Sequence, residues 1–88
     1  MIRRRVVVHG WVQGVFFRDT VRRIAAQRSV AGWVRNNPDG TVEAVLEGRP
    51  EAVEHVTDFL RKGPRDAEVE RVEVLEEQPQ GLSGFIIR

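Results

Sequence analysis

The sequence contains no cysteine and no long run of apolar residues. Without cysteine the chain can form neither disulfide bonds nor thiolate metal sites, and nothing indicates an oxidising compartment. The apolar run near the N-terminus is only the three valines at 6–8, which is too short for a signal peptide or a membrane-spanning helix. We therefore expect a cytoplasmic protein.

A large excess of charge of one sign is also missing. The net charge is +1, which argues against a strongly basic nucleic-acid binder. The charges are nevertheless unevenly placed, because six arginines lie within residues 1–23 and six carboxylates lie within residues 66–77. We interpret most of these charges as solvated faces that aid solubility, with Arg18 as the exception. The alternative is a positive field that attracts an anionic substrate.

The size and composition of the chain favour one folded domain spanning residues 1–88. Hydrophobic residues make up 41% and charged residues 31%, a balance typical of folded proteins rather than disordered ones. A chain of 88 residues is large enough for one small hydrophobic core.

Hydrophobic periodicity and turn signals predict seven elements. We expect strands at 3–12, 32–37, 41–47, 67–76 and 84–88, and helices at 19–28 and 50–62. The turn signal NPDG at 37–40 makes the second and third strands a hairpin. In the third strand Val42, Ala44 and Leu46 alternate with Glu43 and Glu47.

This order of elements predicts an α+β fold of the ferredoxin-like βαββαβ type. The sheet should be mainly antiparallel, with two helices on one face and a short C-terminal strand. A change of apolar parity between Val69 and Val72 predicts a bulge near Glu70 and Arg71. Asp19 suits the positive end of the first helix and is expected to pair with Arg23.

The most informative stretch is Gly10 to Arg18 (GWVQGVFFR), which joins the first strand to the first helix. Backbone N–H groups at a helix start lack intrahelical partners, and the helix dipole adds partial positive charge. Gly14 permits left-handed backbone angles, so that several N–H groups can converge on one point. Arg18 adds a planar guanidinium that can bind two oxygens of a phosphate or carboxylate. The stretch therefore predicts an anion site.

A second stretch, Gly32 to Val42 (GWVRNNPDGTV), is followed by Gly48. Together the two stretches resemble the acylphosphatase family, in which G-x-V-Q-G-V-x-F-R precedes G-W-V-x-N, a short turn, G-x-V and a later glycine. Both patterns occur at the family's usual separation, and the resemblance covers the chain from end to end. Ser29 departs from the glycine that is common after the first helix, and a left-handed serine costs about 1 kcal/mol.

The resemblance implies an enzyme that hydrolyses the carboxyl–phosphate anhydride bond of acyl phosphates to carboxylate and inorganic phosphate. Arg18 matches the family's phosphate-binding arginine, and Asn36 matches its catalytic asparagine, which positions the attacking water. The backbone N–H groups that match the phosphate-binding loop belong to Gln13, Gly14, Val15, Phe16 and Phe17. No metal or cofactor is implied. The expected partners are a small acyl phosphate and inorganic phosphate, with neither nucleic acid nor membrane, bound by a monomer.

The residue chemistry suits this reaction, because a carboxylate leaving group with a pKa of about 4 needs no general acid. By chemistry alone Asn37 is as good an amide as Asn36. The register of the resemblance selects Asn36, and at most one of two consecutive strand residues faces the site. His9 is interpreted as structural, and Trp11 and Trp33 as packing residues or the rim of a pocket.

Two other functions suit the same fold. One is an RNA-recognition module, although the aromatic motif that such modules carry on their central strands is absent. The other is a non-catalytic binding or accessory domain, since acylphosphatase-like domains also occur within larger carbamoyl-transfer proteins. Binding of phosphate without turnover would favour the latter.

Overall fold

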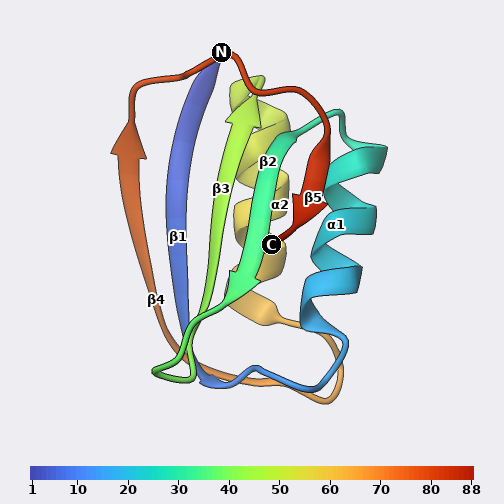
Figure 1. Cartoon of the computed structure of the whole chain (residues 1–88), viewed down its shortest axis with the longest axis vertical. Coiled ribbons are helices and arrows are strands. Elements are labelled where there is room, and N and C mark those ends of the chain that lie inside the picture. Colours follow the sequence, from blue (N-terminus) through green and yellow to red (C-terminus); the bar gives the residue numbers. More distant parts are fainter.

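The computed structural model describes residues 1–88 as five strands and two helices (Figure 1). In chain order they are β1 Ile2–Trp11, α1 Phe17–Gln27, β2 Ala31–Asn36, β3 Val42–Gly48, α2 Pro50–Lys62, β4 Glu68–Glu77 and β5 Phe85–Ile87. Every expected element is present, and no end moves by more than two residues. The largest difference is at α1, which begins at Phe17 because Phe16 ends the preceding loop in a left-handed conformation.

The five strands form one sheet in the order β4-β1-β3-β2-β5. All neighbours are antiparallel except β2 and β5, which run parallel. Figure 1 shows α2 behind β3 and β2 and α1 at the right beside β5, and residues of both helices share one core with the sheet. The opposite face of the sheet, called the open face below, is turned to the viewer. The ferredoxin-like α+β prediction is confirmed. No helix here has the length and apolar character needed to cross a membrane.

The covered face holds the hydrophobic core, because each helix buries the apolar stripe that its 3.6-residue period creates. The buried helical residues are Phe17, Val21 and Ala25 in α1 and Val53, Val56, Thr57 and Leu60 in α2. They pack on sheet residues that include Val6, Val8, Val34, Ala44 and Leu46. A fully buried valine or leucine contributes about 1.5–3 kcal/mol, so this face supplies most of the driving force for folding.

The predicted bulge is confirmed where β4 meets the end of β1. His9 pairs with Arg71 but Gly10 pairs with Val69, so Glu70 is the extra residue. Gly10 has φ 130°, and a Cβ atom there would lie 2.1 Å from the backbone oxygen of Glu68. Only glycine fits this close approach, and the increased twist of the bulge directs the chain out of β1 into the following loop.

The left-handed Ser29 expected after α1 is also present, with φ 56°. The expected pairing of Asp19 with Arg23 is wrong, because Arg22 makes that ion pair at 2.9 Å. Residues three apart on a helix are neighbours just as residues four apart are, and the sequence offers both arginines.

The third strand departs most from expectation. Its apolar residues alternate with Glu43 and Glu47, yet all seven residues of β3 are buried, the two glutamates included. The interpretation of the clustered charges as solvated is wrong for Arg3, which is only 6% exposed and meets the fully buried Glu47 side chain.

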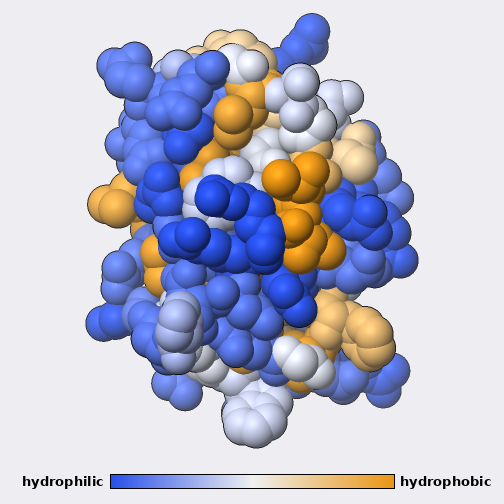
Figure 2. Space-filling model, in the orientation of Figure 1, coloured by the Kyte–Doolittle hydropathy of each residue, from blue (hydrophilic) through white to orange (hydrophobic).

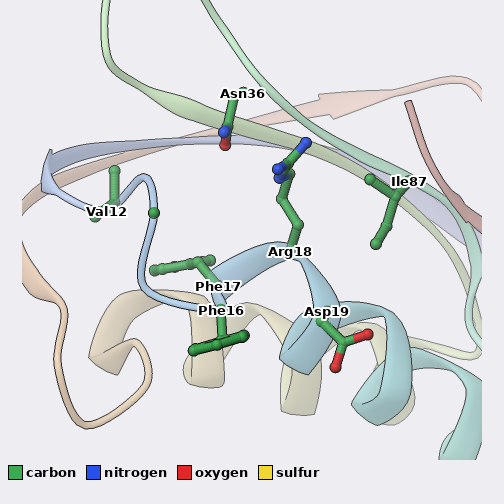
Figure 3. A pocket seen from close by; sticks show the side chains of 8 residues that line it. Val12, Phe16, Phe17, Arg18, Asp19, Asn36 and Ile87 are labelled. Carbon is green, nitrogen blue, oxygen red and sulfur yellow. The ribbon is translucent and has the colours of Figure 1, made fainter.

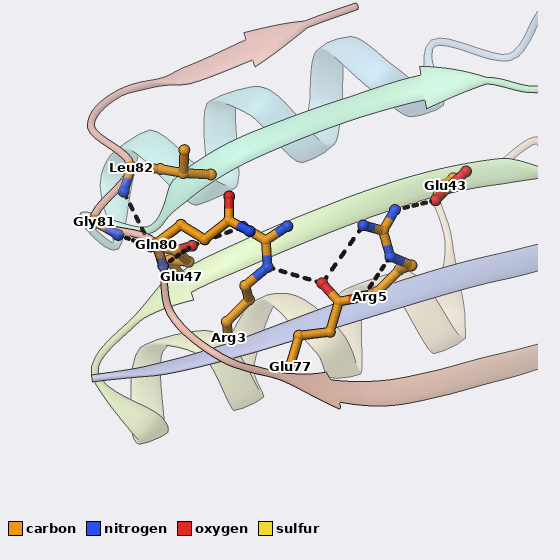
Figure 4. Close-up of polar contacts among 8 residues, drawn as sticks. All are labelled: Arg3, Arg5, Glu43, Glu47, Glu77, Gln80, Gly81 and Leu82. Carbon is orange, nitrogen blue, oxygen red and sulfur yellow. Dashed lines mark hydrogen bonds and ion pairs between the residues drawn. The ribbon is translucent and has the colours of Figure 1, made fainter.

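Ion pairs join these buried charges into one network across the open face (Figure 4). Arg3 donates to Glu47 at 2.7 Å and to Glu77 at 2.8 Å. Arg5 donates to Glu77 at 2.7 Å and also to Glu43. Three strands, β1, β3 and β4, are thereby tied together by side chains as well as by their backbones.

The segment after β4 completes the network above Glu47. Its carboxylate accepts hydrogen bonds from the backbone N–H groups of Gln80, Gly81 and Leu82, at 2.9 to 3.1 Å. Burial opposes the charge of Glu47, but Arg3 and these N–H groups outweigh burial and hold the pKa of the carboxyl below its ordinary value. Glu47 is therefore an ionised and fully paired group inside the protein.

Trp33 of β2 lies beside this network, next to Arg5. The guanidinium carbons of Arg5, Arg35 and Arg88 lie 5.5, 5.0 and 4.5 Å from the centre of its ring, within the range of cation–π attraction. Figure 2 shows the resulting surface, which is hydrophilic across the middle of the open face and hydrophobic over β5.

The network predicts how Glu47 affects stability. Glu47→Gln is expected to lower the free energy of unfolding by about 3 kcal/mol at neutral pH, because the buried Arg3 would lose an anionic partner. Chemical denaturation followed by circular dichroism measures this change. Glu54→Gln is the matched control: Glu54 also pairs with an arginine, Arg4, but is half exposed, so the loss should be far smaller.

The same substitution has a pH signature. Because the pKa of Glu47 is lowered by folding, its stabilisation is present above the unfolded value of about 4.3 and is lost as the pH falls through the folded value. The stability gap between wild type and Glu47→Gln should therefore shrink as the pH falls below the unfolded value of about 4.3. A gap that stayed constant below this pH would contradict the ionised state of Glu47.

Candidate active site

The loop between β1 and α1 is shaped by two left-handed residues. Gly14 has φ 75°, as its place in the loop predicts, and Phe16 has φ 60° and ψ 23°, which nothing in the sequence indicates. Phe16 is the residue before the first turn of α1, and its side chain makes no capping hydrogen bond. The N–H groups of the first turn are therefore left for a partner from outside the helix.

Arg18 and Asn36 come together at this helix start. Both line a pocket of about 320 Å³, whose other residues are Val12, Gly14, Phe16, Phe17, Asp19 and Ile87. Figure 3 shows the guanidinium of Arg18, from α1, beside the amide of Asn36, from the end of β2. Two segments separated in the sequence thus contribute one polar group each to the same space.

Neither of these polar groups is satisfied within the protein. Arg18 takes part in none of the ion pairs of the structure. The side-chain oxygen of Asn36 is buried and has no hydrogen-bond partner. A buried acceptor without a donor costs about 1–3 kcal/mol. The pocket therefore presents a free cation and an oriented acceptor to whatever enters it.

Asp19 is the one carboxylate among the lining residues, and its charge is already paired with Arg22. The N-terminus of α1 adds partial positive charge on the same side. With the guanidinium of Arg18 unpaired, the electrostatics of the pocket favour an anion carrying several oxygens.

The structure distinguishes the roles of Asn36 and its neighbour Asn37, although the chemistry of the two amides is the same. The amide nitrogen of Asn37 donates to Thr41 at 3.0 Å and to Glu43 at 3.1 Å, so Asn37 holds the hairpin turn. It does not line the pocket, whereas Asn36 does. The alternation of the strand thus directs one amide to each role.

Glu43 stabilises the end of β2 by hydrogen bonds on the open face. Its carboxylate accepts hydrogen bonds from Asn37 and, at 3.1 Å, from Arg35, the two residues on either side of Asn36. Burial opposes its charge, yet the hydrogen bonds from Asn37, Arg5 and Arg35 keep the pKa of Glu43 below its ordinary value. The open-face network therefore reaches to within one residue of the pocket.

Gln13 plays a part that sequence analysis missed. It does not line the pocket, and its side chain, rather than its backbone, makes the visible contacts. Its amide nitrogen donates to the backbone oxygens of Asn37 at 2.8 Å and Thr41 at 3.0 Å. These bonds tie the loop to the β2–β3 turn across 24 and 28 residues of chain, a separation that leaves no local signal.

Among the other loop residues singled out from the sequence, Gly14, Phe16 and Phe17 line the pocket and Val15 packs against the core instead. His9 contacts Glu73 and Arg71 outside the pocket, in keeping with a structural role. Trp11 is 69% exposed and borders a neighbouring hollow of about 240 Å³, so it is no packing residue.

Comparison with known proteins gives a consistent result. A family model described as Acylphosphatase matches residues 4–87. A curated protein named Acylphosphatase from Gloeobacter violaceus is 52% identical over 84 residues, which cover 96% of this chain and 90% of that protein. Another of that name from Thermococcus kodakarensis is also 52% identical over 84 residues, covering 96% and 92%.

The fold comparison agrees. A solved structure described as acylphosphatase from Bacillus subtilis superposes with a TM-score of 0.96 at 36% identity, covering 100% of this chain and 99% of that one.

The Gln13 contacts predict that Gln13→Ala loosens the loop. Loss of two hydrogen bonds is expected to speed hydrogen exchange of the Thr20 amide, which donates to the Phe16 oxygen at 3.1 Å, by about tenfold. Exchange followed by mass spectrometry or NMR measures this. Gln80→Ala is the control, because the Gln80 side chain makes no hydrogen bond and lies in a different loop. Unchanged protection of the Thr20 amide in Gln13→Ala would mean that the contacts do not hold the loop.

Proposed function

The chain belongs to the acylphosphatase family, whose members are hydrolases acting on acid anhydrides, and on this premise we propose how its pocket carries out the reaction. Arg18 and backbone N–H groups within residues 13–17 bind the phosphoryl group of an acyl phosphate. Asn36 positions a water molecule for in-line attack on phosphorus. The products are a carboxylate and inorganic phosphate.

The observation that carries this proposal is the buried oxygen of Asn36, which has no partner and lies beside an unpaired guanidinium. An amide oxygen accepts a hydrogen bond from water, while the NH₂ group of the same side chain can donate to a phosphoryl oxygen. The Asn36 side chain can therefore hold the attacking water and the phosphoryl group in the relative position that attack requires. Such positioning is worth about 7 kcal/mol or more in favourable cases.

Charge stabilisation falls to Arg18 and the loop. In phosphoryl transfer the transition state spreads negative charge over the equatorial oxygens, and fixed donors aimed at them lower the barrier. The free N–H groups at the start of α1 and the fork of Arg18 are donors of this kind. Because the loop is fixed by Gly14, Phe16 and Gln13, little reorganisation is needed when charge develops.

The leaving group explains why the pocket contains no histidine. A carboxylate leaves as a stable anion, since its conjugate acid has a pKa of about 4, and it needs no proton at neutral pH. His9 lies outside the pocket and takes no part in the proposed mechanism. We propose a small acyl phosphate as the substrate, a monomer as the active form and the cytoplasm as its location.

Asn36→Ala tests the water-positioning role. The kcat for benzoyl phosphate, measured in EDTA, is expected to fall by about 10² to 10³, while competitive inhibition by inorganic phosphate changes by about threefold or less. Asn37→Ala is the control, because it leaves the pocket amide in place. Full activity of Asn36→Ala would contradict the proposed role.

Arg18→Ala tests phosphoryl binding. Loss of the bidentate cation should lower kcat/KM by about 10³ and abolish inhibition by inorganic phosphate. Arg23→Ala, an exposed arginine of the same helix that does not line the pocket, should change either value by about twofold at most. If wild type bound phosphate at Arg18 but hydrolysed no acyl phosphate, the domain would be a binding module instead.

A further inference from the structure

The pocket has an apolar part that phosphoryl binding does not use. Four of its lining residues are apolar: Val12, Phe16, Phe17 and Ile87. Val12 and Phe17 are almost fully buried and belong to the core, but Phe16 is 81% exposed and Ile87 is 39% exposed. Phe16 and Ile87 are therefore the two side chains that offer apolar surface to a ligand in this pocket.

The backbone holds the Phe16 ring out of the core. Phe16 adopts a left-handed conformation that is unfavourable for any residue with a Cβ atom. Its carbonyl oxygen accepts hydrogen bonds from the backbone N–H of Thr20 at 3.1 Å and from the Thr20 hydroxyl at 2.8 Å, which fixes that conformation. An exposed aromatic ring held in this way gains nothing from packing, and such outliers cluster at ligand sites.

Ile87 is placed at the pocket by the last strand. Along β5, Phe85 packs against the core while Ile86 is exposed, and Ile87 returns to the helix side next to Arg18 (Figure 3). A hydrogen bond from the Arg88 N–H to the Val34 oxygen, 2.9 Å, joins this strand to β2. The strand that carries Asn36 thus also positions Ile87.

The direction of attack places the acyl group near these two residues. If water is held by Asn36, the acyl oxygen must leave from the side of phosphorus opposite to Asn36. In Figure 3, Phe16 lies across the pocket from Asn36, and Ile87 lies beyond Arg18 as seen from Asn36. The only other exposed group lining that side is Asp19, a carboxylate already paired with Arg22.

We propose that Phe16 and Ile87 form an apolar subsite for the acyl group, so that acyl phosphates with aromatic or aliphatic acyl groups are preferred over small or negatively charged ones. This inference rests on the proposed function, because it takes the phosphoryl group to be held at Arg18. No second cation lines the pocket to pair with an acidic acyl group.

The test compares benzoyl phosphate with acetyl phosphate, which share the phosphoryl group but differ in the size and aromatic character of the acyl group, and it compares the ratio of their kcat/KM values between wild type and variants. In Phe16→Ala and in Ile87→Ala the ratio of kcat/KM for benzoyl over acetyl phosphate is expected to fall by about threefold to tenfold. Inhibition by inorganic phosphate should stay unchanged in Ile87→Ala, because Ile87 belongs to β5 and not to the phosphate-binding loop. Matched controls are Trp11→Ala and Ile86→Ala, which remove exposed apolar side chains that do not line this pocket.

A binding measurement separates this inference from the proposed function. Calorimetry gives the dissociation constants of phenylphosphonate and methylphosphonate, which are not hydrolysed, and their ratio should respond to the same variants. Suppose that the enzyme turns over but that both ratios, of kcat/KM and of the dissociation constants, are unchanged in Phe16→Ala and Ile87→Ala, or change equally in the controls. This result would overturn the subsite and leave the proposed function standing. If the wild type hydrolysed no acyl phosphate but the phosphonate ratio still depended on Phe16 and Ile87, the proposed function would be overturned and the apolar subsite would stand. A fall in one variant alone supports the subsite and assigns the contact to that side chain.

Discussion

The paired charges on the open face are the constraint on which the rest of this small protein depends. A strand in the middle of a five-stranded sheet that bears Glu43 and Glu47 can be covered on both faces only if both carboxylates find partners. Arg3 and Arg5 supply them from β1, and Glu77 joins the two arginines from β4. The sheet is thereby held together by side chains on its open side as well as by the helices on the other.

This rigidity extends to the chemistry. Glu43 holds Arg35 and Asn37, and Asn36 stands between them with its own oxygen left free. The loop that faces Asn36 is in turn tied to the same turn by Gln13. A reaction that relies on positioning rather than proton transfer needs such a frame, because small displacements of the positioned groups weaken it.

Local patterns were enough to predict the fold. The 3.6-residue stripes of the helices, the NPDG turn and the parity change near Glu70 each report on a few neighbouring residues, and the structure confirms all of them. Alternation in β3 likewise showed which residues share a face. It could not show whether that face is covered, because the covering groups, Arg3 and the segment at Gln80, come from the two ends of the chain.

The site was predictable to a similar degree. The loop and the helix start pointed to an anion site, and a resemblance of motifs selected Asn36 over Asn37. The side-chain bonds of Gln13 and the left-handed Phe16 were not predictable, since the first depends on partners 24 and 28 residues away and the second breaks a local preference of the backbone. Both features shape the pocket rather than the packing of the core.

The contacts that join Arg3 of β1 and Glu47 of β3 to Glu77 and residues 80–82 also have a consequence for synthesis on the ribosome. Arg3 and Glu77 are 74 residues apart, and Glu47 acquires its N–H partners only from Gln80 to Leu82. A nascent chain that has made β1 and β3 can pair Arg3 with Glu47, but it still lacks the contacts that Glu77 and residues 80–82 supply. The buried charges are therefore fully paired only after β4 and the segment that follows it have been made.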